Sequence, residues 1–451
     1  MEFSTINPWN LQPIETFNNH TDDEANSIIE AVDSTYHQWK KTSFEERASL
    51  LIKVGEVLLK NKQTYADHIT EEMGKPISES LAEIEKCAWV CKFYAENAAK
   101  FLTPKIVETD ASKSFVRYDP LGVIYAIMPW NFPFWQVLRF AAPTLMAGNT
   151  ALLKHALNVT RCAMDIEDAF KEAGYPENAF RTLVLTNDQA SAVIKHPKVR
   201  AVSLTGSERA GEAVASTAGS VLKPSLLELG GSNAVIVLKD ADIDAAVDTG
   251  FRARFLNSGQ SCIAGKRFLI ADEIHDEYVE KFLKRVESLI FNDPTDATTK
   301  IGPLARVDLA EGIEKQVNAS LEKGAVLKIG GKRDGAKYDA TVLTNVTPGM
   351  AAFDEELFGP VAPFIRIKDF DEAIKLSNQS SFGLGVTICT GKVDAALERV
   401  HEFEEGAVFI NELVKSDPRL PFGGIKRSGF GRELGIEGIL EFVNAKSVYV
   451  K

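Results

Sequence analysis

The chain has 451 residues, of which 45% are hydrophobic and 25% are charged, and its formal net charge at pH 7 is -12. This length exceeds what one hydrophobic core usually fills, so we expect two or three domains. The acidic balance, without any basic run, argues against nucleic acid as a partner. No secretion signal is evident, and the longest apolar run, LGVIYAIMPW, is too short to cross a membrane. We therefore expect a cytoplasmic protein that does not bind membranes.

The first hundred residues are predicted to be largely helical. Apolar residues recur at spacings of three and four from Ser78 to Phe101, which indicates a long amphipathic helix, and residues 44–68 show the same period. After Pro120, short β-rich runs alternate with helical patterns or glycine: GVIYAIM, TALLKHA, RTLVLT, RAVSLTG and SLLELGG. A second such series begins near Asn233 with AVIVL, KRFLIAD, APFIRIKDF, GVTICT and GAVFINE. This alternation predicts an α/β fold with parallel sheets.

Two short alternating strands have no helix after them. One is SKSFVRYD at 112–119 and the other is AKSVYVK at the end of the chain. We expect unattached edge strands of this kind to pair with another subunit, in a homodimer or homotetramer.

The cysteines are few, and one has unusual neighbours. The chain has five, with no CxxC pair, which argues against both a disulfide framework and a structural zinc site. We predict no metal site. Cys262 follows Asn-Ser-Gly-Gln-Ser, a segment that favours a turn and leaves backbone N–H groups free. A reactive thiol and an inert one explain this context about equally well.

Asn131 lies in IMPWNFPFWQVLR, directly after the apolar run 122–128. Pro133 suits the first turn of a helix, so we expect Asn131 at or near an N-cap, at the carboxyl end of a strand. Ligands bind at that end of α/β sheets. The Asn131 amide could join the Cys262 backbone N–H in holding an oxyanion, although a plain capping asparagine is the alternative.

Glu228 is a lone carboxylate in KPSLLELGGSN, a run that otherwise indicates a buried strand. Burial raises the pKa of a carboxyl group and makes it a plausible general base. A glutamate paired with a lysine or arginine explains the same pattern at least as well.

The segment SLTGSERAG predicts a glycine turn between a strand and a helix, with Gly206 and Gly211 five residues apart and Ser207 near the helix start. A helix N-terminus offers free N–H groups and a positive dipole end to a pyrophosphate, although a mere tight connection needs the same residues. Lys154, at the end of TALLK, could reach a ribose or a 2′-phosphate, or simply be solvated.

Together these segments resemble the aldehyde dehydrogenase superfamily over essentially the whole chain. MPWNFP, LTGSxxxG, LELGG, NSGQSC, EELFGP and PFGGIKRSGFGRELG occur in the order and at the spacings of that family. More narrowly, MPWNFPFWQVLR, LLKHA and VKSDPRLPFGG are similar to the short bacterial succinate-semialdehyde dehydrogenases that use NAD or NADP.

The resemblance implies a Rossmann-type cofactor domain of residues 1–102 and 121–230, an α/β catalytic domain of 231–431, and a small β oligomerisation arm of 103–120 and 432–451. It also implies roles for single residues. The expected catalytic residues are Cys262 as nucleophile, Glu228 as general base and Asn131 as oxyanion donor. The expected cofactor-binding residues are Trp130, Lys154, Ala156, Leu157, Thr205, Gly206, Ser207, Gly211, Leu229, Gly230, Glu356 and Phe358.

The implied chemistry is the oxidation of an aldehyde to an acid. The Cys262 thiolate attacks the aldehyde carbon, Asn131 stabilises the alkoxide, and a hydride leaves for the nicotinamide. A water deprotonated by Glu228 then releases the acid from the thioester. A non-catalytic protein on the same fold is one alternative, and a dehydrogenase that passes the acyl group to CoA or phosphate is another.

Substrate choice is predicted from one helix face. Asn131, Trp135 and Arg139 are spaced by four, so on one helix Arg139 would line the same tunnel and could bind a carboxylate at the far end of a short substrate. An interdomain ion pair is the alternative for Arg139. Some relatives carry a second arginine where this chain has Leu256, so other residues are expected to supply polar contacts: Ser261, Ser416 and Arg419.

We therefore expect succinate semialdehyde as the small aldehyde substrate, with glutarate semialdehyde, betaine aldehyde or broad aliphatic aldehydes as alternatives. For the cofactor, NAD-selective relatives often have a glutamate three residues after the lysine that Lys154 matches, and this chain has Leu157 there. A cation without an opposing anion should accept a 2′-phosphate, so we expect NADP to be favoured or shared with NAD.

Overall fold

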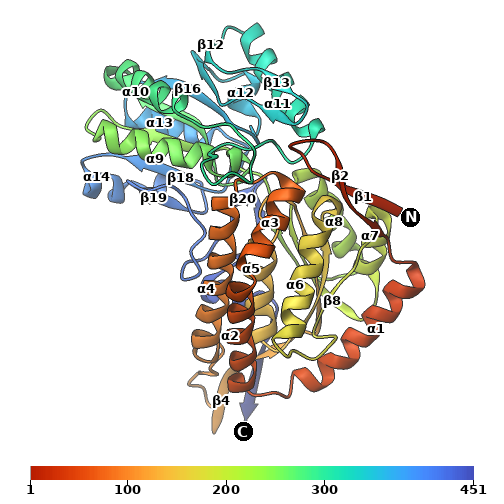
Figure 1. Cartoon of the computed structure of the whole chain (residues 1–451). Coiled ribbons are helices and arrows are strands. Elements are labelled where there is room, and N and C mark those ends of the chain that lie inside the picture. The colour runs from red at the N-terminus through yellow and green to blue at the C-terminus, as the bar shows by residue number, and fades with distance from the viewer. Residues whose placement is uncertain (1) are drawn as a thin grey trace.

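The computed structural model of the protein describes residues 2–451, and Figure 1 shows two lobes with a thin arm that projects from one of them. The first lobe is built on a six-stranded sheet in the order β21-β9-β8-β5-β6-β7, parallel except for the β21–β9 pair. Its strands are β5 (Val123–Met128), β6 (Thr150–His155), β7 (Phe180–Thr182), β8 (Val199–Thr205), β9 (Ser225–Glu228) and β21 (Gly429–Phe430).

Helices cover both faces of this sheet. Alternate residues of β5 explain why: Ile124 and Ala126 pack against one layer of helices, and Val123 and Tyr125 pack against the other. The first layer consists of α2 (Phe44–Lys60), α3 (Lys62–Met73), α4 (Ile77–Phe101), α5 (Trp135–Met146) and α6 (Thr160–Glu172). The second layer consists of α1 (Asp22–Trp39), α7 (Asn187–Lys195) and α8 (Glu208–Ser220).

The second lobe has a seven-stranded sheet in the order β12-β15-β16-β11-β10-β18-β19, in which only the β12–β15 pair is antiparallel. Its strands are β10 (Asn233–Val237), β11 (Gly265–Ala271), β12 (Val326–Ile329), β15 (Thr341–Thr344), β16 (Val361–Ile367), β18 (Val386–Cys389) and β19 (Val408–Ile410). One face packs against α9 (Ile243–Phe255) and α10 (His275–Glu287). The other face packs against α11 (Val307–Glu322), α12 (Ala351–Asp354), α13 (Phe370–Asn378) and α14 (Val393–Glu398).

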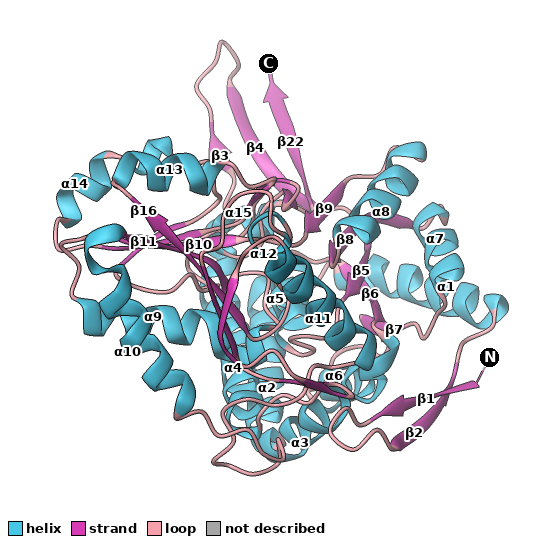
Figure 2. Cartoon of the chain, turned by 90° about the horizontal axis from the view of Figure 1, so that it is seen from above, coloured by secondary structure: helices cyan, strands magenta, loops and turns pink. Residues whose placement is uncertain are grey.

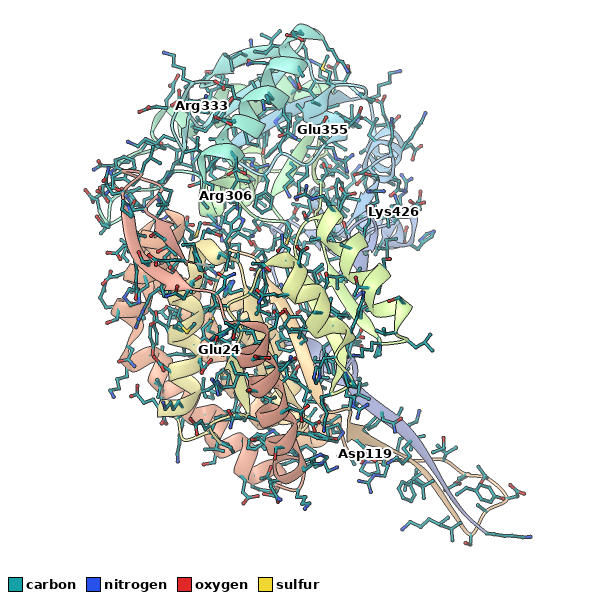
Figure 3. The ribbon with its side chains drawn as sticks, turned by 90° about the vertical axis from the view of Figure 1, so that its right-hand side faces the viewer. Glu24, Asp119, Arg306, Arg333, Glu355 and Lys426 are labelled. Atoms are coloured by element: carbon teal, nitrogen blue, oxygen red, sulfur yellow. The ribbon has the colours of Figure 1, made fainter. Side chains whose placement is uncertain are left out.

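A three-stranded antiparallel sheet forms the projecting arm, and Figures 2 and 3 show it standing away from both lobes. It consists of β3 (Lys105–Ile106), β4 (Lys113–Pro120) and β22 (Val443–Val450), and α15 (Gly435–Leu440) precedes the last strand. The remaining short pairs are β1 (Glu2–Ile6) with β2 (Pro13–Asn18), β13 (Arg333–Asp334) with β14 (Lys337–Tyr338), and β17 (Phe382–Gly383) with β20 (Ile425–Lys426). Single 3-10 turns are η1 (Leu157–Val159), η2 (Leu256–Gly259), η3 (Asp272–Ile274) and η4 (Val400–Glu402).

The predicted α/β fold with mainly parallel sheets is confirmed, and the structure corrects three details. The stretch 44–68 is two helices, because the first one ends at Lys60 and a new one starts at Lys62. The strands at 112–119 and at the C-terminus are not unattached, because β4 and β22 pair with each other over eight residues. The two-stranded sheet near the N-terminus and the strands between 326 and 344 were not predicted.

The domain boundaries remain a prediction. The sheet of the first lobe uses strands from before residue 231, with the exception of β21. Among the described helices none is long and apolar enough to cross a membrane. Within residues 2–451, no group of three or more His, Cys, Asp or Glu side chains is arranged to hold a metal ion.

Candidate active site

A cavity of about 380 Å³ lies at the carboxyl ends of β5, β8 and β9, and both lobes contribute to its walls. This is the edge of a parallel sheet at which ligands bind. Ten of the predicted site residues line it: Trp130, Asn131, Thr205, Gly206, Ser207, Leu229, Gly230, Cys262, Glu356 and Phe358. The sequence did not single out four further lining residues: Pro129, Gln136, Arg306 and Leu309. Figure 3 labels Arg306 between the two lobes.

The loop that carries Cys262 is held in an unusual conformation. Asn257 and Ser258 precede it with left-handed φ angles of 54° and 53°, which are strained for residues with a side chain. Two side chains outside the turn, one at the end of α9 and one on α4, hold it. The buried Arg254 guanidinium donates to the carbonyl oxygens of Gly259 at 2.8 Å and Gly359 at 2.7 Å. Glu79 of α4 accepts the Asn257 N–H at 2.7 Å.

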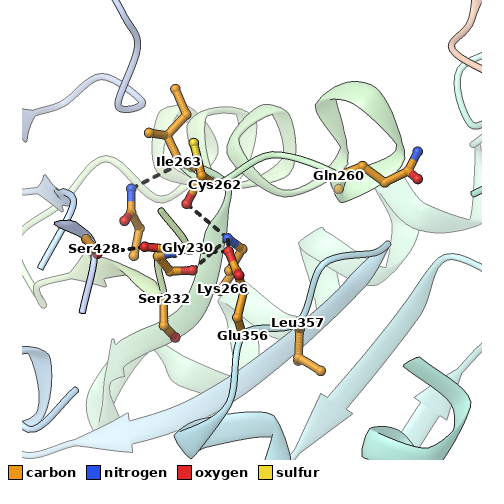
Figure 4. A network of polar contacts seen from close by, with 12 residues as sticks. Gly230, Ser232, Gln260, Cys262, Ile263, Lys266, Glu356, Leu357 and Ser428 are labelled. Carbon is orange, nitrogen blue, oxygen red and sulfur yellow. Dashed lines mark hydrogen bonds and ion pairs between the residues drawn. The ribbon is translucent and has the colours of Figure 1, made fainter. Parts of the chain in front are cut away.

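Cys262 is half-buried, whereas the other four cysteines are fully buried. Burial raises the pKa of its thiol to about 11, and the charges of Lys266 and Arg139 act in the opposite direction. Figure 4 shows the Lys266 ammonium, which donates to the Cys262 carbonyl oxygen at 2.9 Å and to the Glu356 Oε1 at 2.6 Å. The thiol is therefore protonated near neutral pH and needs a base before it can attack.

Asn131 lines the same cavity with its amide held in place. Its Nδ2 donates to the Gln260 carbonyl oxygen at 3.0 Å, and its Oδ1 accepts from Gln136 at 3.0 Å. One amide hydrogen remains free for an oxyanion. The predicted N-cap position is wrong, because the helix begins at Trp135, four residues later. Glu83 of α4 accepts the first helical N–H groups instead, those of Phe134 and Trp135.

Glu228 ends β9 and is 1% exposed. Neither carboxylate oxygen has a hydrogen-bond partner, and no described basic side chain pairs with it. Burial, and then the nearby Glu433, raise its pKa well above the usual value. Gly423 lies so close that a Cβ there would sit 2.5 Å from Oε1. Glu228 does not line the cavity, but its charge raises the pKa of Cys262, so the two groups lie within electrostatic reach.

The glycine turn begins a helix as predicted. Ser207 is the N-cap of α8, and its hydroxyl accepts the N–H of Ala210 at 3.4 Å. Gly211 has a different surrounding from the one expected, since it does not line the cavity. A Cβ there would sit 2.6 Å from the Leu229 side chain, so Gly211 allows helix and strand to pack closely.

Lys154 is the last residue but one of β6 and is 8% exposed, and burial lowers its pKa. Its ammonium lies 3.4 Å from Asn187 Oδ1, and no described carboxylate forms an ion pair with it. Ala156 and Leu157 follow it, half-buried, at the start of η1. These three residues do not line the 380 Å³ cavity.

Glu356 and Phe358 come from the second lobe. Glu356 Oε1 already accepts from Lys266 and from the Gly231 N–H at 3.0 Å, so only its second oxygen is left for a ligand. That oxygen faces Gly230, where a Cβ would sit 2.5 Å away. The Phe358 ring meets Trp130 edge to face, with centroids 5.8 Å apart.

The predicted carboxylate anchor has another partner. Arg139 is 3% exposed and forms an ion pair with Glu433 at 2.5 Å. Its guanidinium also donates to the Thr205 hydroxyl at 3.3 Å. This is the structural alternative that the sequence left open, and it leaves Arg139 neutralised. The sequence could not show it, because Glu433 is almost 300 residues away in the chain.

The remaining substrate residues divide into two groups. Trp135 and Ser416 are buried together, and the indole N–H donates to the Ser416 hydroxyl at 3.0 Å. Arg419 points away from them, since its side chain is 67% exposed and pairs with Asp417 at 2.6 Å. Ser261 is buried beside Cys262 and does not line the cavity. The geometry therefore gives no support to Arg419 as a substrate ligand.

Two α/β lobes with a cavity at the carboxyl ends of parallel strands, and with a half-buried cysteine in its wall, are the layout of an α/β enzyme that binds its ligand at this edge of the sheet. A profile of the aldehyde dehydrogenase family matches residues 1–448, and the chain belongs to this family.

Among known proteins, the chain is 46% identical to a probable succinate-semialdehyde dehydrogenase [NADP(+)] of Synechocystis sp., over all of both chains. It is 44% identical to the succinate-semialdehyde dehydrogenase [NADP(+)] of Mycobacterium leprae, again over all of both chains. Among solved structures, the succinic semialdehyde dehydrogenase of Streptococcus pyogenes in complex with NADP+ superimposes with a TM-score of 0.97. That protein is 36% identical, and the match covers 99% of each chain.

Proposed function

We propose that the protein oxidises succinate semialdehyde to succinate with NADP as the cofactor. The observation that carries this proposal is the position of Cys262 and Asn131 on one cavity together with the glycine turn before α8. The full-length similarity to relatives named for this substrate and this cofactor supports it.

The residues beside the cavity fit a dinucleotide. Ser207 and the first turn of α8 offer N–H groups to a pyrophosphate, and the free oxygen of Glu356 can accept from a ribose hydroxyl. Lys154, which has no described acidic partner, suits a 2′-phosphate. When bound, NADP supplies the acceptor for the hydride that the substrate loses.

Cys262 would act first. Its thiol gives its proton to a water molecule, and the sulfur adds to the aldehyde carbon to form a thiohemiacetal. The free Asn131 amide hydrogen and the Cys262 N–H stabilise the oxyanion, a contribution of about 3 kcal/mol for each such donor in other enzymes. Lys266 holds the Cys262 carbonyl oxygen, so the backbone that carries the sulfur stays in place.

Glu228 would act on the thioester that results from hydride loss. As a carboxylate it takes a proton from water, the hydroxide adds to the thioester carbon, and succinate leaves while the sulfur regains a proton. The raised pKa makes Glu228 a stronger base but lowers its ionised fraction near neutral pH. Acyl release should therefore speed up as the pH rises.

The test is aldehyde-dependent formation of NADPH, with succinate identified as the product. Cys262→Ala should reduce turnover by more than about a thousandfold, because no other group forms the covalent intermediate. Cys389→Ala is the matched control, since Cys389 is buried in β18 away from the cavity. A substantial rate in Cys262→Ala, or a product that requires CoA or phosphate, contradicts the proposal.

The arm supports a further part of the proposal, a homodimer or homotetramer. Ile106, Tyr449 and Val450 on the arm are large apolar residues with exposures of 68%, 56% and 46%. Such side chains on a projecting sheet favour burial against a second copy. Light scattering of the purified protein measures the subunit number, and a monomer would contradict this part. The five unpaired thiols fit the expected cytoplasmic location.

A further inference from the structure

We infer that Lys86 of α4 is the cation that binds the distal carboxylate of the substrate, together with the hydroxyl of Ser416. This inference rests on the proposed function, since it assumes that the substrate carries a carboxylate at the end remote from the aldehyde. The sequence did not single out Lys86, which lies within the long amphipathic helix.

The first step is that neighbouring cations are already neutralised. Arg139 is paired with Glu433, and the exposed Arg419 is paired with Asp417. Lys75, also near α4, is buried in an ion pair with Glu83. A substrate carboxylate at any of these cations would have to compete with a protein carboxylate that is already in place.

The second step is that Lys86 has no such partner. Its ammonium donates to Ser416 Oγ at 2.8 Å and lies 4.0 Å from the centroid of the Trp135 ring. No described carboxylate lies within ion-pair distance of it, although its side chain is half-buried. A partly desolvated cation held by a hydroxyl and an aromatic face alone retains N–H donors for an anion.

The third step concerns the hydrogen-bond direction at Ser416. The Ser416 oxygen accepts both from Lys86 and from the Trp135 indole N–H, at 2.8 and 3.0 Å. Neither partner can accept in return, so the hydroxyl hydrogen of Ser416 is left to point elsewhere. Lys86 and Ser416 thus present an N–H and an O–H donor side by side, the arrangement that the two oxygens of a carboxylate require.

The fourth step places this cluster relative to Cys262. Arg139 lies close enough to Cys262 to lower the pKa of its thiol, and close enough to Lys86 to lower the pKa of its ammonium. Trp135, whose ring packs against the Lys86 ammonium, follows Asn131 by four residues in the sequence. Lys86 and Cys262 thus both lie within electrostatic reach of Arg139, and we expect the far end of a short substrate to extend from Cys262 toward the cluster.

The charge of Lys86 should depend on pH in the range in which the enzyme can be assayed. Burial, and then Arg139, lower its pKa to about 8, whereas Cys87, Glu83 and Asp417 raise it. The Lys86 ammonium loses its charge as the pH rises through about 8, and with it the attraction for a carboxylate. The ratio of kcat/KM for succinate semialdehyde to kcat/KM for butanal should fall over that range, because butanal has the same chain length but no charge.

The experiment measures both aldehydes with NADP in the wild type, in Lys86→Met and in Lys86→Arg. Lys86→Met keeps a long apolar stem over Trp135, so it should raise KM for succinate semialdehyde by about ten- to a hundredfold, the usual range for a charged hydrogen bond. The KM for butanal should change far less, and Lys86→Arg should restore part of the difference. Lys92→Met is the control, because Lys92 lies on the same helix with a 69% exposed side chain.

The outcomes separate this inference from the proposed function. Equal kcat/KM for the two aldehydes in the wild type overturns both. A wild-type preference for succinate semialdehyde that Lys86→Met retains overturns only the role of Lys86, as does an equal rise of KM for both aldehydes. If Lys86→Met does not fold, the pH profile of the wild-type ratio decides, and a flat ratio between pH 7 and about 9 contradicts the inference.

Discussion

The buried polar groups of this protein fall into two regions that differ in how completely they are paired. Around the Cys262 loop, Arg254 donates to four backbone carbonyl oxygens, and Lys266 donates to two carbonyl oxygens and a carboxylate. At the ends of the proposed substrate and cofactor sites, Glu228, Lys86 and Lys154 lack partners of opposite charge. Since buried charges without such partners are costly, we interpret the first region as a scaffold and the second as places kept open for ligands.

Removing a group from the open region should impair activity without loss of stability. Glu228→Gln should retain a rapid first turnover of NADPH, because the base acts only after hydride loss, and slow the steady rate by about a hundred- to ten-thousandfold. Stopped-flow absorbance at the NADPH band separates the two phases. Loss of the first turnover itself would contradict the assignment of Glu228 as the base for water.

Glu228→Gln should also change the stability of the protein, in a direction that the raised pKa of Glu228 fixes. The pKa of Glu228 is raised in the folded protein, so its ionisation favours unfolding once the pH exceeds the unfolded value of 4.5. Glu228→Gln removes this penalty. Its free energy of unfolding should equal that of the wild type near pH 4.5 and exceed it increasingly toward pH 8, provided that unfolding is reversible. A variant less stable than the wild type at pH 8 would show that Glu228 has a stabilising partner.

A substitution in the scaffold region should instead lower the stability of the protein. Arg254→Met leaves buried carbonyl oxygens without donors and should lower the free energy of unfolding by about 3 kcal/mol or more. Denaturant unfolding followed by tryptophan fluorescence measures it. The matched control is Arg252→Met on the same helix, where the side chain is 59% exposed and should change stability little. Equal stability of both variants would mean that Arg254 does not support the Cys262 loop.

The features that could be predicted from the sequence are those that depend on neighbouring residues, and the features that were missed depend on contacts between distant segments. Strands such as β5 and β10 were predictable because both faces are buried and their sequences are almost continuously apolar. Cys262 and Asn131 were identified by local motifs, and both line the cavity. The groups that hold them were missed, since the contact between Glu79 and Asn257 spans 178 residues and nothing local indicates it.

Arg139 shows the complementary error. The spacing argument placed Asn131 and Arg139 on one helix, but α5 begins at Trp135, and Arg139 does not line the cavity. Its charge is paired with Glu433, from the other end of the chain. Lys86 was overlooked for the same reason, because its neighbours Trp135 and Ser416 lie on two other segments. A charged residue on an amphipathic helix is usually solvated, and only its unpaired state in the folded chain indicates a ligand.

The smallest expected effect comes from giving Lys154, one of the unpaired cations, a partner of opposite charge. Leu157→Glu places a carboxylate near Lys154, where it would neutralise the ammonium and repel a 2′-phosphate. The ratio of kcat/KM for NADP to that for NAD should fall about tenfold, which corresponds to 1.4 kcal/mol, and the shift should shrink at high salt. Leu157→Gln controls for size and polarity without charge. If the two variants change the ratio equally, Lys154 does not select the cofactor by charge. A buried cation without an acidic partner would then not by itself indicate a ligand site in this protein.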